Sequence, residues 1–214
     1  MKQGRFITIE GGEGVGKSTQ LAALREWLTA RIDDVVFTRE PGGTPRAEKI
    51  RELLLAATDE PMPPTAELLL MFAARATHLE NVIRPALQRG AWVVCDRFTD
   101  ATYAYQGGGR GMDMQQIAVL EALVQRELHP DLTLLLDAPL DLTSVRAQRR
   151  NSDVGVVDRF ELEQRAFFER VRDAYLIRAR SFPERIAVID ASGSIESVAS
   201  AMRATIEHRL MNHG

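Results

Sequence analysis

The sequence has few of the features that mark secreted, membrane-spanning or nucleic-acid-binding proteins. Its single cysteine, Cys95, excludes a disulfide within the chain and is consistent with a reducing compartment. Because Cys95 lies in the apolar run 92–95, we expect a buried structural thiol and not a nucleophile. No apolar run is long enough to cross a bilayer, and the chain opens without a charged and then apolar leader, so we expect a cytoplasmic protein with no membrane partner. A formal net charge of −3 provides no basic field for nucleic acid.

The composition is that of an ordinary globular protein, with 45% hydrophobic and 27% charged residues. A chain of 214 residues can bury the core of one α/β domain, and it contains no internal repeat, low-complexity tract or linker. We therefore expect a single domain over residues 1–214.

A glycine-rich stretch follows the first apolar run of the chain. Residues 6–9 are apolar or β-branched and predict a buried strand, and a helical pattern begins at Lys17. Between them, Gly11-x-x-x-x-Gly16-Lys17-Ser18 has the Walker A spacing. Glycines allow the backbone to approach a ligand closely, and the loop amides and the start of the helix then face an anion. The sequence predicts a nucleoside-triphosphate site, with Lys17 on the β- and γ-phosphates and Ser18 on Mg²⁺.

Apolar strands and helical segments alternate along the rest of the chain. Further strands are predicted at 35–38, 91–95, 132–136 and 186–189, and helices at 17–31, 44–57, 65–90, 113–128, 140–150, 158–180 and 194–210, with Pro85 kinking the third helix. This alternation predicts an α/β fold with a five-stranded parallel sheet and helices on both faces. Three consecutive glycines, 107–109, weaken any helix, so a flexible surface loop is the simplest interpretation of residues 103–111.

Charged residues follow two of the predicted strands. Asp96 closes an apolar strand in the Walker B manner and is expected to meet Mg²⁺ or its water shell, while Arg97 beside it carries a charge suited to phosphate. Arg39 and Glu40 end another strand, where open parallel sheets bind ligands. On spacing alone, a solvated ion pair is an equally good interpretation of these two residues. Arg75 has unusually apolar neighbours for an arginine on a surface.

The Walker A loop alone leaves the reaction open. A signalling GTPase would normally carry an Asn-Lys-x-Asp segment after a late strand, and here those strands end in Leu-Asp-Ala (136–138) and Ile-Asp-Ala (189–191). A motor-type ATPase would usually be larger, and a nucleotide-binding switch would bind without turnover. A small-molecule kinase needs an acceptor pocket and a lid that excludes water. The arginine-rich stretch 146–150 fits such a lid, although a solvated helix end is the other interpretation.

Four blocks of the sequence, in order along nearly the whole chain, resemble bacterial thymidylate kinases. They are IEGGEGVGKS (9–18), REPGGT (39–44), DRF (96–98) and YQGGGRG (105–111). The resemblance implies a P-loop NTPase-type fold with a short mobile lid at about 146–160, and a homodimer that pairs through helices. It also implies transfer of the γ-phosphate of ATP to dTMP with Mg²⁺, giving dTDP and ADP, a step in dTTP synthesis for DNA replication.

The resemblance also implies roles for individual residues. ATP would be bound by Gly11, Gly12, Glu13, Gly14, Val15, Gly16, Lys17, Ser18 and Thr19, and by Arg146 stacked on adenine. The dTMP contacts would be Arg39, Pro41, Met71, Phe72, Arg75, Arg97, Ala101, Thr102, Tyr105 and Gln106. The catalytic residues would be Lys17, Arg97, Arg150, Glu13 and Asp96, and the metal ligands Ser18, Asp96, Asp158 and Glu161.

Two positions depart from the family pattern. The family commonly stacks thymine on a phenylalanine four residues before the arginine that reads the base; here that residue is Met71, and Phe72 lies about 100° further around a helix. We favour Met71, whose polarisable thioether can replace a ring. The stretch 151–157 is longer than in related lids, so Arg149 remains an alternative to Arg150 as the lid arginine.

Overall fold

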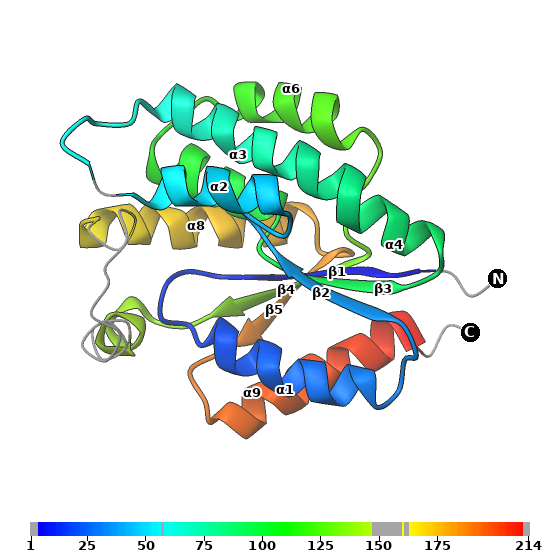
Figure 1. Cartoon of the computed structure of the whole chain (residues 1–214). Helices are drawn as coiled ribbons and strands as arrows, with labels where there is room; N and C mark the ends of the chain where they lie inside the picture. The colour runs from blue at the N-terminus through cyan, green and yellow to red at the C-terminus, as the bar shows by residue number, and fades with distance from the viewer. Residues whose placement is uncertain (1–3, 57, 147–159, 161–162, 212–214) are drawn as a thin grey trace.

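A five-stranded parallel sheet forms the centre of the protein (Figure 1). The computed structural model describes residues 4–56, 58–146, 160 and 163–211. Its strands are β1 (Phe6–Glu10), β2 (Val35–Arg39), β3 (Trp92–Asp96), β4 (Leu132–Asp137) and β5 (Ile186–Asp190). They lie in the order β2-β3-β1-β4-β5, and each neighbouring pair is parallel. The predicted α/β fold with a five-stranded parallel sheet is confirmed.

Helices cover both faces of this sheet. They are α1 (Lys17–Thr29), α2 (Pro45–Leu55), α3 (Pro64–His78), the π-helix η1 (Leu79–Ile83), α4 (Arg84–Gln88), α5 (Thr99–Thr102), the π-helix η2 (Tyr103–Gly109), α6 (Met114–Gln125), α8 (Arg165–Ser181), α9 (Ile195–Ile206) and the π-helix η3 (Glu207–Met211). Residues 140–146 are also helical. Figure 1 shows α1 and α9 on one face, and α2, α3, α6 and α8 on the other. Within the described ranges, no helix is long and apolar enough to span a membrane.

The two faces of β1 have different neighbours because side chains alternate along a strand. Ile7 and Ile9 belong to the core under α1 and α9. Phe6 packs on the opposite side, in a core that includes Leu79 of η1. By the same alternation Glu10, the last residue of β1, points into the layer that contains α8. This orientation decides what Glu10 can contact at the sheet edge.

The glycine run 107–109 lies in the π-helix η2 and not in a flexible surface loop, so that expectation is wrong. Gly107 and Gly109 are buried. A Cβ at position 108 would lie 2.6 Å from Cβ of Ala174, and one at position 109 would overlap the ring of Phe167. The glycines let η2 approach α8 more closely than side chains would permit. Tertiary packing overrides the weak helix propensity of glycine here.

Two other helical segments differ in detail from the prediction. The irregularity expected at Pro85 takes the form of the π-helix η1, which ends just before α4. The helix predicted from residue 158 begins at Arg165. Before it, the chain turns inward, because the Phe160 ring packs 6.0 Å from the ring of Tyr105 and Glu163 pairs with Arg110.

Candidate active site

The loop between β1 and α1 forms a backbone cradle. Gly14 and Gly16 have φ values of 73° and 94°, and a Cβ at Gly14 would overlap a neighbouring backbone carbonyl. Gly16 caps α1 without a side-chain hydrogen bond, which leaves N–H groups of the first turn for a ligand. Lys17 Nζ donates to the carbonyls of Gly11 (3.1 Å) and Gly12 (3.2 Å), and burial lowers its pKa. The loop has the geometry and the charge of an anion site.

A cavity of about 810 Å³ opens over this loop and is called the phosphate-loop cavity below. Its lining includes Glu13 to Gln20, which contain most of the loop residues predicted to contact ATP. Arg146 lines it as well, and its Nη1 donates to the carbonyl of Ala191 at 3.0 Å. Arg146, predicted to stack on adenine, therefore lies at the rim of the same cavity as the loop.

Ser18 and Asp96 lie together beside the loop and fit a magnesium ion. Both line the phosphate-loop cavity, and Oδ1 of Asp96 is buried with no hydrogen-bond donor among the described residues. A buried carboxylate oxygen without a partner needs a cation or a donor. The described part of the chain has no cluster of three or more His, Cys, Asp or Glu that could hold a metal, so phosphate oxygens and water would supply the remaining ligands, as is usual for Mg²⁺.

Four predicted residues cannot be placed. Arg149, Arg150, Asp158 and Glu161 lie outside the described residues, as does most of the predicted lid. Their roles stay predictions.

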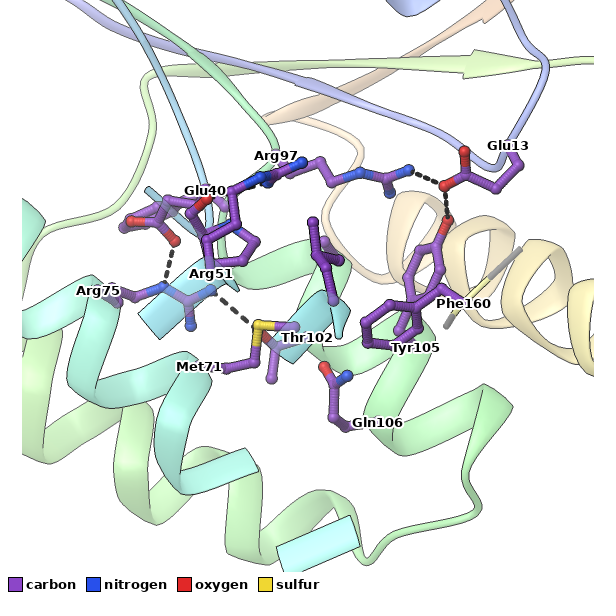
Figure 2. Close-up of a pocket in the computed structure, with 14 residues that line it drawn as sticks. Glu13, Glu40, Arg51, Met71, Arg75, Arg97, Thr102, Tyr105, Gln106 and Phe160 are labelled. Carbon is purple, nitrogen blue, oxygen red and sulfur yellow. Dashed lines mark hydrogen bonds and ion pairs between the residues drawn. The ribbon is translucent and has the colours of Figure 1, made fainter. Parts of the chain in front are cut away.

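A second cavity, the inner cleft, lies between α3, η2 and the phosphate loop (Figure 2). It is lined by Glu13, Glu40, Pro41, Arg51, Leu55, Met71, Arg75, Arg97, Phe98, Ala101, Thr102, Tyr105, Gln106 and Phe160. Most of the residues predicted to bind dTMP are in this set. Glu13, Arg51 and Arg97 line both cavities. The two cavities therefore meet at these three charged side chains.

One end of the inner cleft is formed by a buried arginine, Arg75 of α3. Its Nε donates to Oε2 of Glu40 at 2.7 Å and its Nη2 to Thr102 Oγ1 at 2.9 Å. The third nitrogen, Nη1, is buried with no acceptor among the described residues. His78 Nδ1 lies 3.0 Å from the other oxygen of Glu40, and its Nε2 lies 2.6 Å from Thr38 Oγ1. The network fixes the guanidinium and leaves Nη1 for a ligand acceptor.

Neighbouring residues in the sequence lie in different environments around this network. Met71 lines the inner cleft, whereas Phe72 is 2% exposed and packs in a core with Leu68 of α3. At the end of β2, Glu40 is buried beside Arg75, whereas Arg39 is exposed and pairs with Glu48. Met71 and Glu40 thus line the inner cleft. Phe72 and Arg39, both predicted to contact dTMP, are not in the lining of the inner cleft.

The other end of the cleft is formed by Arg97, directly after β3. Its Nη2 donates to Glu13 Oε1 at 2.7 Å and its Nη1 to the carbonyl of Gly11 at 3.0 Å. Tyr105 donates to the same oxygen of Glu13 at 3.1 Å, and burial raises the pKa of its hydroxyl, so it remains a donor. Arg51 of α2 completes this end and donates to the carbonyl of Pro41 at 3.0 Å. Positive charge is concentrated where the cavities meet.

Three site residues carried no signal in the sequence: Glu10, Glu40 as a partner of Arg75, and Arg51. Arg51 is one of several charged residues on α2 and belongs to no motif. Glu10 is 0% exposed, and burial, assisted by the charge of Asp100, raises its pKa from 4.5 to about 7. The sequence predicts that Glu10 lies at the end of a strand. Its contact with Tyr175, 165 residues further along the chain, could not be predicted in this way.

The sheet is parallel, a Walker A loop follows its central strand, and an acid ends the adjacent strand. Together these features define a P-loop nucleotide-binding protein. A model of the thymidylate kinase family matches residues 9–202. The chain is 63% identical over 211 residues to thymidylate kinase of Chromohalobacter salexigens, covering 98% of both chains, and 59% identical to that of Pseudomonas putida (strain F1), covering 91% of both. Crystalline thymidylate kinase from Ehrlichia chaffeensis superposes with a TM-score of 0.76 at 33% identity, covering 95% of this chain and 99% of that one. This chain belongs to the thymidylate kinase family.

The raised pKa of Glu10 should make stability depend on pH. Between about pH 4.5 and 7, Glu10 is ionised in the unfolded chain and largely protonated in the folded protein, so its contribution to stability falls as the pH rises. The Glu10→Gln variant does not titrate at this position. Its free energy of unfolding relative to the wild type should therefore increase across this interval, by about 3 kcal/mol at most, and level off above it.

Urea unfolding at several pH values measures this difference. Glu48→Gln is the control, because the hydrogen bond from Arg39 lowers the pKa of Glu48, so this carboxylate stays ionised in both states above about pH 5.5. Its difference from the wild type should be flat there. Parallel curves for Glu10→Gln and the wild type would contradict the titration of Glu10 in this range.

Proposed function

We propose that this protein transfers the γ-phosphoryl group of ATP to dTMP, producing dTDP and ADP, a step in dTTP synthesis for DNA replication. The observation that carries the proposal is the meeting of two cavities at Glu13, Arg51 and Arg97. One cavity has a phosphate loop, and the other has a buried arginine at its far end. A donor and an acceptor nucleotide bound in them would bring their phosphates together at this junction.

The side chains at the junction supply position and positive charge. Phosphoryl transfer passes through a loose transition state whose charge lies on oxygens, so few covalent steps are left to the protein. Lys17 and the loop amides would hold the donor phosphates, and Arg97 and Arg51 the acceptor phosphate. Mg²⁺ held through Ser18 and Asp96 would neutralise further phosphate charge. No general base is needed, because a phosphate monoester is largely ionised near neutral pH.

At the other end of the cleft, the base would meet Arg75, Thr102 and Met71. The donor Nη1 of Arg75 has no acceptor among the described residues and matches a carbonyl oxygen on a pyrimidine edge. Met71 lines the same end and offers an apolar surface to the ring. The proposal also includes four predictions. They are a lid role for Arg150 or Arg149, stacking of Arg146 on adenine, a single-domain chain and a cytoplasmic location.

The protein is proposed to form a homodimer through α3 and α6. These helices contact each other and lie at the outer edge of their layer in Figure 1. They expose large apolar side chains, Leu69 on α3 and Val119 and Leu123 on α6, at 53%, 67% and 72%. Contiguous exposed apolar side chains of this size favour burial against another surface.

Leu123→Glu should therefore convert the dimer to a monomer, because it places a charge in the apolar contact. Sedimentation velocity measures the change. Val188→Glu is the control, since Val188 is also exposed, at 49%, but lies on β5 across the molecule. Equal behaviour of both variants would contradict an α3–α6 interface.

We expect dTMP to be the best acceptor and ATP the best donor. A coupled assay of ADP release, run across the common nucleoside monophosphates, measures this directly. Chelation of Mg²⁺ should abolish turnover, because the ion would supply positive charge at the phosphates that a hydroxyl and a carboxylate cannot supply. A preference for AMP, GMP or CMP would contradict the assignment of dTMP as the acceptor.

Tyr105 should exclude ribose from the inner cleft. Tyr105 is 6% exposed and lines the cleft, and its ring centroid lies 4.8 Å from the guanidinium of Arg97. A sugar fixed at both ends has little room to avoid this ring, so a 2′-hydroxyl would clash with it. Tyr105→Ala should raise kcat/KM for the ribonucleotide relative to dTMP by roughly tenfold.

Tyr105→Phe is the matched control for this effect. It keeps the ring and removes only the hydroxyl, which bonds to Glu13 and Arg97, so discrimination between the sugars should persist. Melting temperatures of both variants are measured alongside. An equal loss of activity with both sugars in Tyr105→Ala, together with a lower melting temperature, would show that the ring only supports packing.

A further inference from the structure

The backbone at Arg97 adopts a conformation that needs support from its surroundings. Its φ of 66° lies in the left-handed region, which is uncommon for a residue with a long side chain. The N–H of Arg97 donates to the carbonyl of Ile9 at 3.0 Å, and its own carbonyl accepts from Sγ of Cys95 at 3.0 Å. The left-handed turn lets the side chain leave β3 and extend toward Glu13 (Figure 2).

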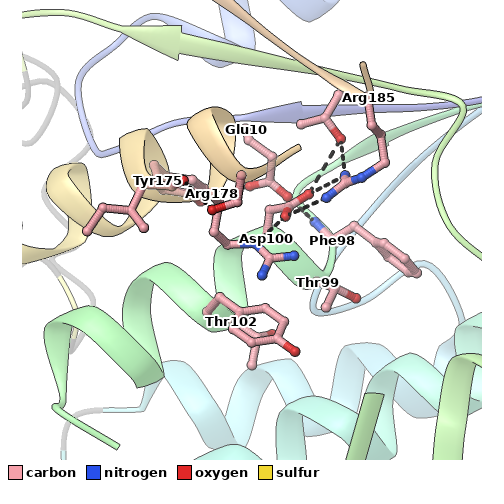
Figure 3. Close-up of polar contacts among 12 residues, drawn as sticks. Glu10, Phe98, Thr99, Asp100, Thr102, Tyr175, Arg178 and Arg185 are labelled. Carbon is pink, nitrogen blue, oxygen red and sulfur yellow. Dashed lines mark hydrogen bonds and ion pairs between the residues drawn. The ribbon is translucent and has the colours of Figure 1, made fainter. Parts of the chain in front are cut away.

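One buried carboxylate, that of Glu10, contacts this turn through one oxygen and helix α8 through the other. Oε1 accepts the N–H of Phe98, the residue after Arg97, at 2.7 Å. Oε2 accepts the hydroxyl of Tyr175, on α8, at 2.8 Å. Figure 3 shows Glu10 between Phe98 and Tyr175. Glu10 and Tyr175 are 0% and 3% exposed, so water does not compete with these bonds.

The hydroxyl of Tyr175 also contacts the tip of Arg97. Arg97 Nη1 donates to this oxygen at 3.2 Å. A phenol has one proton and two lone pairs, so Tyr175 can donate to ionised Glu10 and accept from Arg97 at the same time. A continuous set of hydrogen bonds thus joins Glu10 to both the backbone and the guanidinium of the arginine.

The hydroxyl of Tyr175, which lies between Glu10 and Arg97, contacts the guanidinium without neutralising its charge. Glu13 contacts the guanidinium directly at 2.7 Å and compensates its charge. Burial and the charge of Glu10 raise the pKa of Tyr175 well above its ordinary value, so this hydroxyl stays neutral. The Tyr175 hydroxyl therefore orients the guanidinium of Arg97 and leaves its positive charge available to a phosphate.

A second ion pair holds α8 in the position that this contact requires. Arg178, one helical turn beyond Tyr175, pairs with Asp100 at 2.6 Å. Arg185 pairs with the other oxygen of Asp100, also at 2.6 Å (Figure 3). Asp100 lies three residues after Arg97, so the segment that follows the left-handed turn is fixed to α8.

We propose that Glu10 and Tyr175 are positioning residues for Arg97, which hold its guanidinium in the orientation that meets the phosphate of the acceptor nucleotide. Neither residue lines the inner cleft, so both act through Arg97. The inference rests on the proposed function, since it takes the acceptor phosphate as the ligand of Arg97.

The test compares a ligand with a phosphate and a ligand without one. In Tyr175→Phe, calorimetry at about pH 8, above the pKa of Glu10, should show dTMP binding weakened roughly tenfold, while thymidine binding changes less than about twofold. The kcat/KM for dTMP should fall accordingly, with the KM for ATP unchanged. Tyr103→Phe is the control, because the buried Tyr103 also donates to a glutamate, Glu121 at 2.6 Å, and has no contact with Arg97.

Two further variants separate positioning from support of the fold. In Arg97→Ala, the advantage of dTMP over thymidine should fall to what Arg51 still supplies, and adding Tyr175→Phe should change neither affinity. Glu10→Gln, which keeps the size of the side chain, should weaken dTMP binding in the same selective way. Equal weakening of dTMP and thymidine in Tyr175→Phe, or a further loss of dTMP binding in the Arg97→Ala background, would overturn the inference. A wild-type protein that fails to phosphorylate dTMP would instead refute the proposed function, and that result is visible before any variant is made.

Discussion

A guanidinium group cannot be withdrawn from water unless something compensates its charge, and two arginines at the sheet edge, one buried and one partly buried, are subject to this constraint. Arg75, 2% exposed, has Glu40 as its partner; Arg97, with a side chain 17% exposed, has Glu13 and the hydroxyl of Tyr175. Removal of either glutamate would leave a buried charge without its compensation, so each pair has to be kept together. The inner cleft is the space between the two pairs, with one positive group fixed at each end.

The parallel sheet brings these groups together. Its five strands end in Glu10, Arg39, Asp96, Asp137 and Asp190, and the carboxyl ends of parallel strands lie at one edge. Apolar runs keep the strands buried, and the first charged residue of each run is left at that edge. The same pattern that builds the core therefore concentrates ionisable groups on one side of the molecule.

Features that depend on contiguous residues could be predicted from the sequence. The phosphate loop is such a feature, because the backbone of six neighbouring residues builds it. The strands are another, because their burial is visible as apolar runs. Most inner-cleft residues came from resemblance to a family, since no spacing indicates that Thr102 contacts Arg75.

Features that depend on contacts between distant segments could not be predicted. Local propensity of the glycine run 107–109 suggests a loop, and the close approach of α8 makes it a helix. Choosing between Met71 and Phe72 required the rotation of α3 about its axis, which amphipathic spacing gives only approximately. Placing Glu40 required knowing that the chain turns inward after β2, and placing Arg51 required the position of α2 over the sheet edge.

Under the proposed function, the contact between Glu13 and Arg97 would make phosphate binding an exchange of one anion for another. A single oxygen of Glu13 accepts from both Arg97 and Tyr105. An incoming phosphate must replace this internal counter-ion, so its affinity reflects the difference between two charge-assisted contacts and not the full strength of one. When the product leaves, Glu13 would again accept hydrogen bonds from Arg97 and Tyr105, so the charge of Arg97 would stay compensated. A tethered carboxylate would therefore favour rapid release of the anionic product and lower the occupancy of the cleft by other anions.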